Sequence, residues 1–139
     1  MSAKPKIACY CLKTRRAAAA ITRHYDQALA PCGMTSAQFS LLLNLSYSPG
    51  CTASKLAALL DLDRSTLTRN LRPLVGKKLV RDASPPEARD SQLELTARGK
   101  QALQCAQVRW EQAQEDVRQR LGEVGLAALD AALAALEKL

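Results

Sequence analysis

Two short segments in the middle of the chain, joined by very few residues, constrain its fold more than any other feature. Residues 53–60 follow Thr52, and residues 64 to about 78 follow Asp63. Thr and Asp are favoured N-cap residues, so each segment is predicted to be a helix that begins directly after its cap. Only Asp61 and Leu62 precede the second cap, so the two helices are predicted to form a helix-turn-helix unit.

Both predicted helices carry an apolar stripe at helical spacing, which we expect to face a common core. Pro73 lies inside the second helix and is expected to bend it or to weaken its turn. The expected core residues are Leu56, Leu59 and Leu60 in the first helix, and Leu67, Leu71, Leu74 and Val75 in the second.

A predicted β-hairpin follows the second helix. Residues 79–81 and 92–95 alternate apolar and polar side chains as short strands do, and they flank a polar, proline-rich loop at residues 83–91. A helix-turn-helix followed by a two-stranded hairpin is a winged helix. The predicted fold class is therefore α+β and mostly α.

Helical segments flank this unit on both sides. Residues 7–29 contain neither Gly nor Pro, and Pro31 and Gly33 end them. Thr35 or Ser36 is expected to cap a helix that runs to about Tyr47. Its buried candidates are Phe39, Leu42, Leu43 and Leu45.

After the hairpin, Thr96 is predicted to open a long helix, Gly122 and Gly125 to break it, and a final helix to follow. The terminal helices carry apolar stripes that the rest of the chain is too small to cover, so a second subunit is the simplest cover. The stripes are Ile7, Cys11, Thr14, Ala18, Ile21, Tyr25 and Ala28; Leu103, Ala106, Trp110, Ala113, Val117 and Leu121; and Leu126, Leu129, Leu133 and Leu136.

Positive charge is concentrated in two parts of the chain. The formal net charge is +7, with an excess of Lys and Arg in residues 1–31 and 64–100 and an acidic excess in residues 101–139. Such asymmetry suggests a face that binds a polyanion. No apolar run approaches the length of a membrane span, so we expect a cytoplasmic protein with no membrane partner. Five cysteines in such a chain are expected to be reduced thiols.

The sequence resembles the MarR family of bacterial transcription regulators over nearly its whole length. The resemblance is strongest in LAALLDLDRSTLTRNLRPLVGKKLV, residues 56–80, and in RDASPPEARDSQLELTARG, residues 81–99. These match the family's order of helix, recognition helix, "G-L-V" strand, wing and "L-T-x-x-G" motif. Lys78 stands where the family's first glycine usually sits. Glu87-Ala88-Arg89 replaces the wing's usual D-x-R, and Gln92 stands where an Arg is common.

The resemblance implies a winged helix-turn-helix homodimer with N- and C-terminal dimerisation helices. A single MarR-type domain would span residues 1–139, with residues 1–33 and 100–139 as dimerisation helices. Residues 34–99 would form the DNA-binding region, with the helix-turn-helix at 52–78 and the wing at 79–95. The expected function is a repressor that binds a palindromic double-stranded operator and is released by a small-molecule or oxidant inducer.

The predicted recognition helix offers side chains suited to DNA. Arg can bond guanine, Asn can bond adenine, and Ser and Thr can bond phosphates or bases. We expect Arg89 at the wing tip to enter a narrow minor groove, held by a charge-assisted bond from Glu87. The remaining candidates are Arg64, Ser65, Thr66, Thr68, Arg69, Asn70 and Arg72, with Lys55, Lys77 and Lys78 as phosphate contacts.

The sequence offers little for catalysis. The single histidine, His24, has no nearby nucleophile and is expected at a surface or interface, and there is neither a Gly-rich phosphate loop nor a C-x-x-C pair. We therefore expect no enzyme, no cofactor and no metal site. Two other classes remain open: a thiol- or metal-handling protein, and a helical interaction module without DNA affinity.

Cys9-Tyr10-Cys11 is the most unusual local feature. In a helix the two thiols would point about 200° apart and could not share one metal ion; in an extended segment they could bind a soft metal or metalloid. Cys11 also aligns with the reactive cysteine of the OhrR peroxide-sensing branch, and Tyr25 with a tyrosine that this branch uses. Arg15 replaces a second such tyrosine. Thiol sensing, metal sensing, a small-molecule inducer and a merely buried Cys11 all remain open.

Overall fold

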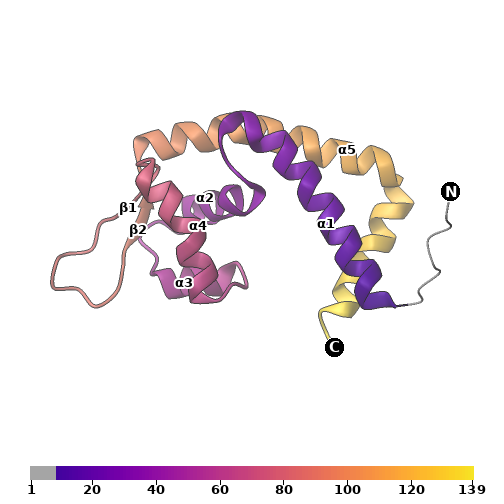
Figure 1. Cartoon of the computed structure of the whole chain (residues 1–139), viewed down its shortest axis with the longest axis horizontal. Coiled ribbons are helices and arrows are strands. Elements are labelled where there is room, and N and C mark those ends of the chain that lie inside the picture. The colour runs from indigo at the N-terminus through magenta and orange to yellow at the C-terminus, as the bar shows by residue number, and fades with distance from the viewer. Residues whose placement is uncertain (1–8) are drawn as a thin grey trace.

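The computed structural model describes residues 9–139 and consists of a winged-helix lobe and a helical arm (Figure 1). Ile7, the first residue of the predicted terminal stripe, lies outside the described residues. The elements are α1 (Tyr10–Leu29), a 3₁₀ turn η1 (Ala30–Cys32), α2 (Ser36–Tyr47), α3 (Ala53–Leu59), α4 (Arg64–Gly76), β1 (Val80–Asp82), β2 (Leu93–Leu95) and α5 (Ala97–Leu136).

Four helices begin where their capping residues predict. Thr52, Asp63 and Thr96 each accept a hydrogen bond from the backbone N–H three residues further on, at the starts of α3, α4 and α5. Thr35 and Gln38 form a reciprocal capping box at the start of α2. These bonds satisfy N–H groups that have no partner inside the helix. The predicted starts are thus confirmed.

The hairpin is present, with its first strand shifted by one residue from the predicted 79–81 and its second strand one residue shorter than the predicted 92–95. Its antiparallel strands pair Val80 with Leu95 and Asp82 with Leu93, while Leu79 and Gln92 lie just outside the strands. Cys51 adds an isolated bridge to Leu93, and the backbone N–H of Leu93 donates to the Cys51 carbonyl at 2.9 Å. The hairpin is therefore joined to the segment that precedes α3.

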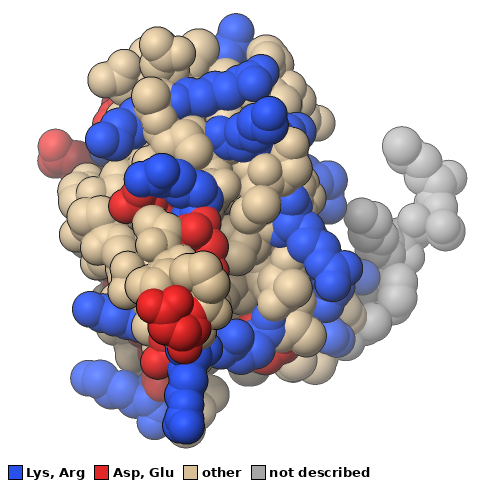
Figure 2. Space-filling view, turned by 90° about the vertical axis from the view of Figure 1, so that its left-hand side faces the viewer, with Lys and Arg blue, Asp and Glu red and all other residues tan. Residues whose placement is uncertain are grey.

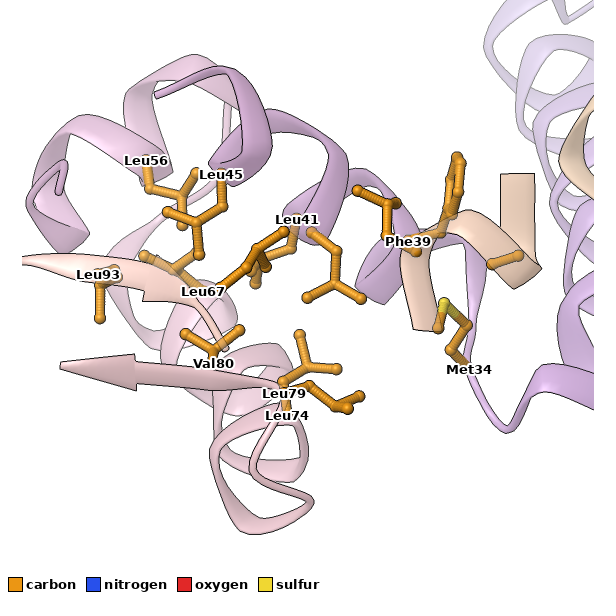
Figure 3. Close-up of a cluster of buried hydrophobic side chains, with 14 of the residues drawn as sticks. Met34, Phe39, Leu41, Leu45, Leu56, Leu67, Leu74, Leu79, Val80 and Leu93 are labelled. Carbon is orange, nitrogen blue, oxygen red and sulfur yellow. The ribbon is translucent and has the colours of Figure 1, made fainter. Parts of the chain in front are cut away.

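The core lies where α2, α3, α4 and the hairpin converge (Figure 3). Leu56, Leu67 and Leu74 are buried there as predicted. Leu59 and Val75 are 50% and 46% exposed, so their expected burial is wrong. Both lie at the edges of short helices, where the stripe is wider than the face that the neighbouring elements cover.

Helix α2 is buried more completely than its sequence predicts. Leu41 is fully buried although it was not among the candidates, because α2 contacts elements on several sides. Leu43, in contrast, is only half-buried. Phe39 stacks on Trp110 of α5 with ring centroids 5.6 Å apart, which attaches the lobe to the long helix.

One unusual backbone position lies in the turn between α4 and the hairpin, and a second lies in α5 where it packs against this turn. Helix α4 continues through Pro73 to Gly76, and Lys78 then adopts a left-handed conformation with φ of 60°. The family resemblance described above implies a glycine at this position, and glycine adopts such a φ without strain. At Gly99, an added Cβ would lie 2.0 Å from the carbonyl oxygen of Leu79, so the close approach of α5 to this turn requires glycine.

Helix α5 is interrupted at one glycine instead of two. Gly122 has φ 68° and ψ 175°, outside the helical region, whereas Gly125 lies within the helix. Before the interruption, Leu103, Ala106 and Ala113 are already buried within one chain, although a second subunit was expected to cover this stripe. The kink lets the last part of α5 turn down beside α1 (Figure 1).

The helical arm consists of α1 and residues 111–136 of α5, which pack against each other. His24 Nε2 lies 2.9 Å from Asp116 Oδ2, and the Tyr25 hydroxyl donates to Gln114 Oε1. Burial raises the pKa of Tyr25, with Asp116 also raising it and Arg118 opposing, so its hydroxyl stays protonated and remains a donor. The terminal helices therefore cover each other in part, which their sequences alone did not show.

Much of the arm's apolar surface stays exposed within one chain. Ile21 and Leu133 are 40% and 43% exposed, and Leu121 and Leu136 are also exposed. Among the described residues, no helix is both long and apolar enough to cross a membrane.

Candidate nucleic-acid interface

The outward side of α4 carries a cluster of basic and hydroxyl side chains. Positions 64, 65, 68, 69 and 72 repeat at helical spacing, so they share the side of the helix opposite the buried Leu67 and Leu74. All five are exposed and together line a shallow depression. They are Arg64, Ser65, Thr68, Arg69 and Arg72. We call this set the α4 face.

The hydroxyl groups of the α4 face are already bonded within the chain. Ser65 Oγ donates to Asp63 Oδ1 at 2.7 Å, and Thr68 Oγ1 donates to the Arg64 carbonyl at 2.8 Å. A hydroxyl has one hydrogen, so each retains only acceptor capacity toward other groups. The three arginines are therefore the donors that this face can offer to an anionic ligand.

Asp63 organises the start of the α4 face. It accepts from the Thr66 backbone N–H and the Ser65 hydroxyl, each at 2.7 Å, and these bonds lower its pKa to about 2. A carboxylate at this position also suits the positive end of the helix dipole. Asp63 is thus a constant negative charge that holds the helix start in place.

Arg64 also receives support from the preceding helix. Its guanidinium donates to the hydroxyl of Ser54 on α3, which sequence reasoning did not single out. Lys55, the next residue of α3, is exposed. Thr66 and Asn70 are half-buried at the margin of α4, so they flank the α4 face instead of lying on it.

The wing stands beside α4 across a groove of about 450 Å³. Arg64 and Arg89 both line this groove, so α4 and the wing border a common space. Ser91 at the end of the wing accepts from the Ala53 backbone N–H at 2.8 Å, which holds the wing against the start of α3. Arg89 is exposed.

The expected bond between Glu87 and Arg89 is wrong. Within residues 9–139, ion pairs form between other side chains, and both of these residues are exposed. Instead, Asp82 organises the wing by accepting from the backbone N–H groups of Ser84 and Gln92 at 3.0 and 2.9 Å. These two bonds lower the pKa of Asp82. An Asp two residues before a Ser in a loop is a recognisable turn signal that could have identified it.

Basic side chains are spread over much of the end of the molecule that carries the hairpin (Figure 2). Acidic side chains gather in a narrower strip on the same side. One of the basic groups is already paired, because Arg81 on β1 forms an ion pair with Glu94 directly across the hairpin. The positive charge available to a ligand therefore comes from α4 and the wing tip more than from the strands.

The candidate sensing residues lie far from this interface, on α1. Cys9 adopts an extended conformation just before α1, Cys11 lies in its first turn, and both are exposed. The fourteen residues between Cys11 and Tyr25 correspond to about 21 Å along the helix, so these two side chains do not meet within one chain. Among residues 9–139, no three His, Cys, Asp or Glu side chains are grouped closely enough to hold a metal ion.

Comparison with known proteins identifies the family. A model of the MarR family matches residues 33–90. The M. tuberculosis transcriptional regulator MosR, solved in complex with DNA, is 40% identical and has a TM-score of 0.79; the match covers 94% of this chain and 96% of MosR. The chain belongs to the MarR family.

Two further relatives agree with this assignment. The transcriptional repressor CouR, solved with a 23-mer DNA duplex, superposes with a TM-score of 0.85 at 28% identity, covering 97% of this chain and 99% of CouR. A transcriptional regulatory protein for the hcr operon of Thauera aromatica is 38% identical over 72 residues, 51% of this chain. The matched region spans only 43% of that relative's length. The agreement over whole chains therefore comes from MosR and CouR.

Proposed function

We propose that this MarR-family chain is a homodimeric transcriptional repressor that binds a palindromic duplex operator and is released by an inducer. The observation that carries the proposal is the shared groove, in which Arg64 of the α4 face and Arg89 of the wing approach one space from two elements. A helix and a flanking loop that carries an arginine are suited to adjacent grooves of one duplex. The MosR and CouR structures, both solved with DNA, support the same role.

In this proposal the α4 face enters the major groove. Arg69 is the candidate for a two-bond contact to guanine, and Asn70 for a contact to adenine from the margin of the helix. Arg64 and Arg72, at the two ends of the face, fit phosphate contacts. Ser65, Thr66 and Thr68 serve as acceptors or packing groups, since the hydroxyls of Ser65 and Thr68 already donate within the chain. Lys55 adds a phosphate contact from α3.

Arg89 is proposed to enter the minor groove beside the recognition helix. Its side chain is free of the ion pair expected with Glu87, so it can reach away from the wing without breaking an existing bond. A narrow minor groove has a strongly negative potential that attracts arginine. We further propose that the protein acts in the cytoplasm as a DNA-binding regulator and not as an enzyme.

The exposed apolar surface of the arm supports the homodimer. Ile21, Leu121 and Leu133 would be covered by the same surface of a second copy, as a two-fold interface requires. We assign residues 1–33 and 100–139 to dimerisation and residues 34–99 to DNA binding. Two linked recognition helices then read two symmetric half-sites.

Cys11 is the proposed sensing residue if the inducer is an oxidant, with Cys9 as its neighbour. The exposure of both thiols favours access by a solute. Tyr25 could serve Cys11 only across two subunits, and it would first have to release Gln114, to which it donates its single hydrogen. Hydroperoxide titration of operator-bound protein tests this: Cys11→Ser should abolish release and Cys9→Ser should not. Equal release from both variants would contradict a sensing role for Cys11 and would favour a small-molecule inducer.

Selection of bound duplexes from a random pool tests the main proposal. We expect an enriched palindrome, and binding that weakens steeply with salt because phosphate contacts release counterions. Arg69→Ala should weaken binding by roughly 1–3 kcal/mol and relax base preference at one position in each half-site. Arg89→Ala should weaken binding with less change in preference.

Arg118→Ala is the matched control. Arg118 lies on α5 and pairs with Glu115, away from the α4 face. This variant should bind like the unaltered protein. A pool without an enriched palindrome, or equal losses from Arg118→Ala and Arg69→Ala, would contradict the proposal.

A further inference from the structure

Two cysteines that play no part in the proposed function lie side by side where the lobe meets the long helix. Cys32 ends η1 and is half-buried; Cys105 lies on α5 and is exposed. The two elements pack against each other, and the two thiols are close enough to interact. Seventy-two residues separate them in sequence, so only the fold brings them together.

The guanidinium of Arg109 completes this cluster. It lies one helical turn beyond Cys105 on α5 and contacts the Cys32 thiol. Burial and the neighbouring Cys105 thiol raise the pKa of Cys32, whereas Arg109 lowers it. The arginine therefore favours the thiolate of Cys32 against the effect of its surroundings.

The position of the pair within the chain is as informative as its chemistry. The chain enters the winged-helix lobe just after η1 and leaves it along α5. Cys32 therefore lies where the chain enters the lobe, and Cys105 lies where it leaves. Gly33, directly after Cys32, accepts a hydrogen bond from Lys77 Nζ at the end of α4, at 2.8 Å. A bond between the two sulfurs would thus close the lobe at its base, next to the end of the recognition helix.

We propose that Cys32 and Cys105 are a redox-active pair that a hydroperoxide converts to an intramolecular disulfide. The exposed Cys105 thiolate attacks the terminal peroxide oxygen, which breaks the O–O bond and leaves a sulfenic acid on Cys105. The released alkoxide takes up the proton lost from the Cys105 thiol and becomes an alcohol. The Cys32 thiolate then attacks the Cys105 sulfur and expels hydroxide, which takes up the proton lost from the Cys32 thiol. Overall, two thiols and one hydroperoxide give one disulfide, one alcohol and one water.

The bridge would stabilise the lobe strongly. It would close a loop of about 70 residues that contains α2, α3, α4 and the hairpin, and long loops gain most from closure because the unfolded chain loses the most freedom. The midpoint of thermal unfolding should rise by about 10 °C and return to its former value on reduction. This effect is measured without DNA, so it stands or fails independently of operator binding.

The test uses the full chain with Cys9→Ser and Cys11→Ser, which leaves Cys32, Cys105 and the buried Cys51. After treatment with cumene hydroperoxide and blocking of free thiols, peptide mapping should show Cys32 joined to Cys105 within one chain. Cys51 should stay free and serves as the internal control. In a further Cys32→Ser variant, Cys105 should instead accumulate sulfinic acid.

Arg109→Gln separates a chemical role from mere proximity. Loss of the positive charge should lower the ratio of disulfide to sulfinic acid about three- to fourfold, because fewer Cys32 thiolates are available to attack. Arg120→Gln, exposed about 16 Å further along α5, should leave this ratio unchanged. Sulfinic acid on Cys105 without a bridge, a bridge only between two chains, or a bridge that includes Cys51 would overturn the proposal.

Discussion

The winged-helix lobe and the helical arm contain similar apolar stripes but bury them to very different degrees. In the lobe, Leu41, Leu56 and Leu67 are fully buried within one chain. In the arm, Ile21, Leu133 and Leu136 remain substantially exposed although they lie on equally regular stripes. The lobe has a hydrophobic core that is complete within one chain, whereas the apolar side chains of the arm are only partly covered.

The number of elements that meet in each region explains the difference. Helices α2, α3 and α4 and the hairpin converge on one point, so a leucine there is surrounded on all sides. The arm contains only two helices, and two helices can cover only the strip along which they touch. A stripe wider than that strip needs a further partner.

The sharpest test of this comparison replaces one leucine in each region. Leu67→Ala should lower the free energy of unfolding by about 2–5 kcal/mol, because a fully buried side chain leaves a cavity. Leu133→Ala should cost less, and its cost should depend on protein concentration if a second copy covers it. Chemical denaturation at several protein concentrations measures both. A concentration-dependent loss for Leu67→Ala but not for Leu133→Ala would reverse the comparison.

Gly99→Ala tests the junction between the two regions. The new Cβ would lie 2.0 Å from the Leu79 carbonyl oxygen, so the start of α5 must move away from the turn before β1. We expect a loss of about 2–3 kcal/mol, measured by denaturation. Gly76→Ala is the control, since a Cβ there has open space around it. Equal losses would mean that the close approach at Gly99 is unimportant.

Asp63 lies in the lobe, and its titration should make the stability of the lobe depend on pH. The pKa of Asp63 is about 2 in the folded chain and near 3.8 in the unfolded chain. Between these two pH values the folded state therefore binds fewer protons than the unfolded state. The contribution of Asp63 to stability is therefore fully present above about pH 4 and is lost as the pH falls toward 2. Asp63→Asn should show a weaker decline in stability between pH 4 and 2, measured by thermal unfolding. An unchanged decline would assign the acid sensitivity to other carboxylates.

The smallest expected effect is a gain at the turn between α4 and β1. Lys78→Gly should stabilise the lobe by up to about 1 kcal/mol, because glycine adopts the positive φ of this residue without strain. The adjacent Lys77→Gly is the control: Lys77 has a φ of −82°, and its replacement removes the hydrogen bond to Gly33. That variant should be destabilised. A loss for Lys78→Gly would show that the lysine side chain outweighs the backbone strain.

Local chemistry made the helix starts and the hairpin predictable. Thr35, Thr52, Asp63 and Thr96 each accept a hydrogen bond from the backbone N–H three residues away, so a short stretch of sequence is enough to predict the helix start. The resemblance to the MarR family added the prediction that α4 and the wing are the parts that contact DNA. The chain's membership of that family is confirmed, whereas the roles of individual DNA-contact residues remain predictions.

Burial was predictable only in part, because it depends on which side of a helix its neighbours occupy. Leu59 and Val75 satisfy the helical spacing yet are half-exposed, whereas Leu41 is fully buried on a helix that packs against several elements. The wing shows the same limit. Glu87 and Arg89 are close in sequence but do not pair, and Asp82 instead joins the two ends of the wing.

The sequence by itself determined the order of the elements, their starts and the basic character of α4, since these follow from residues near one another along the chain. Only the tertiary structure decided which distant side chains meet. Cys32 and Cys105 come together because η1 packs on α5, and Arg64 and Arg89 share a groove because the wing is held against α3. Such contacts depend on the summed packing of the whole lobe, which no local pattern of residues encodes.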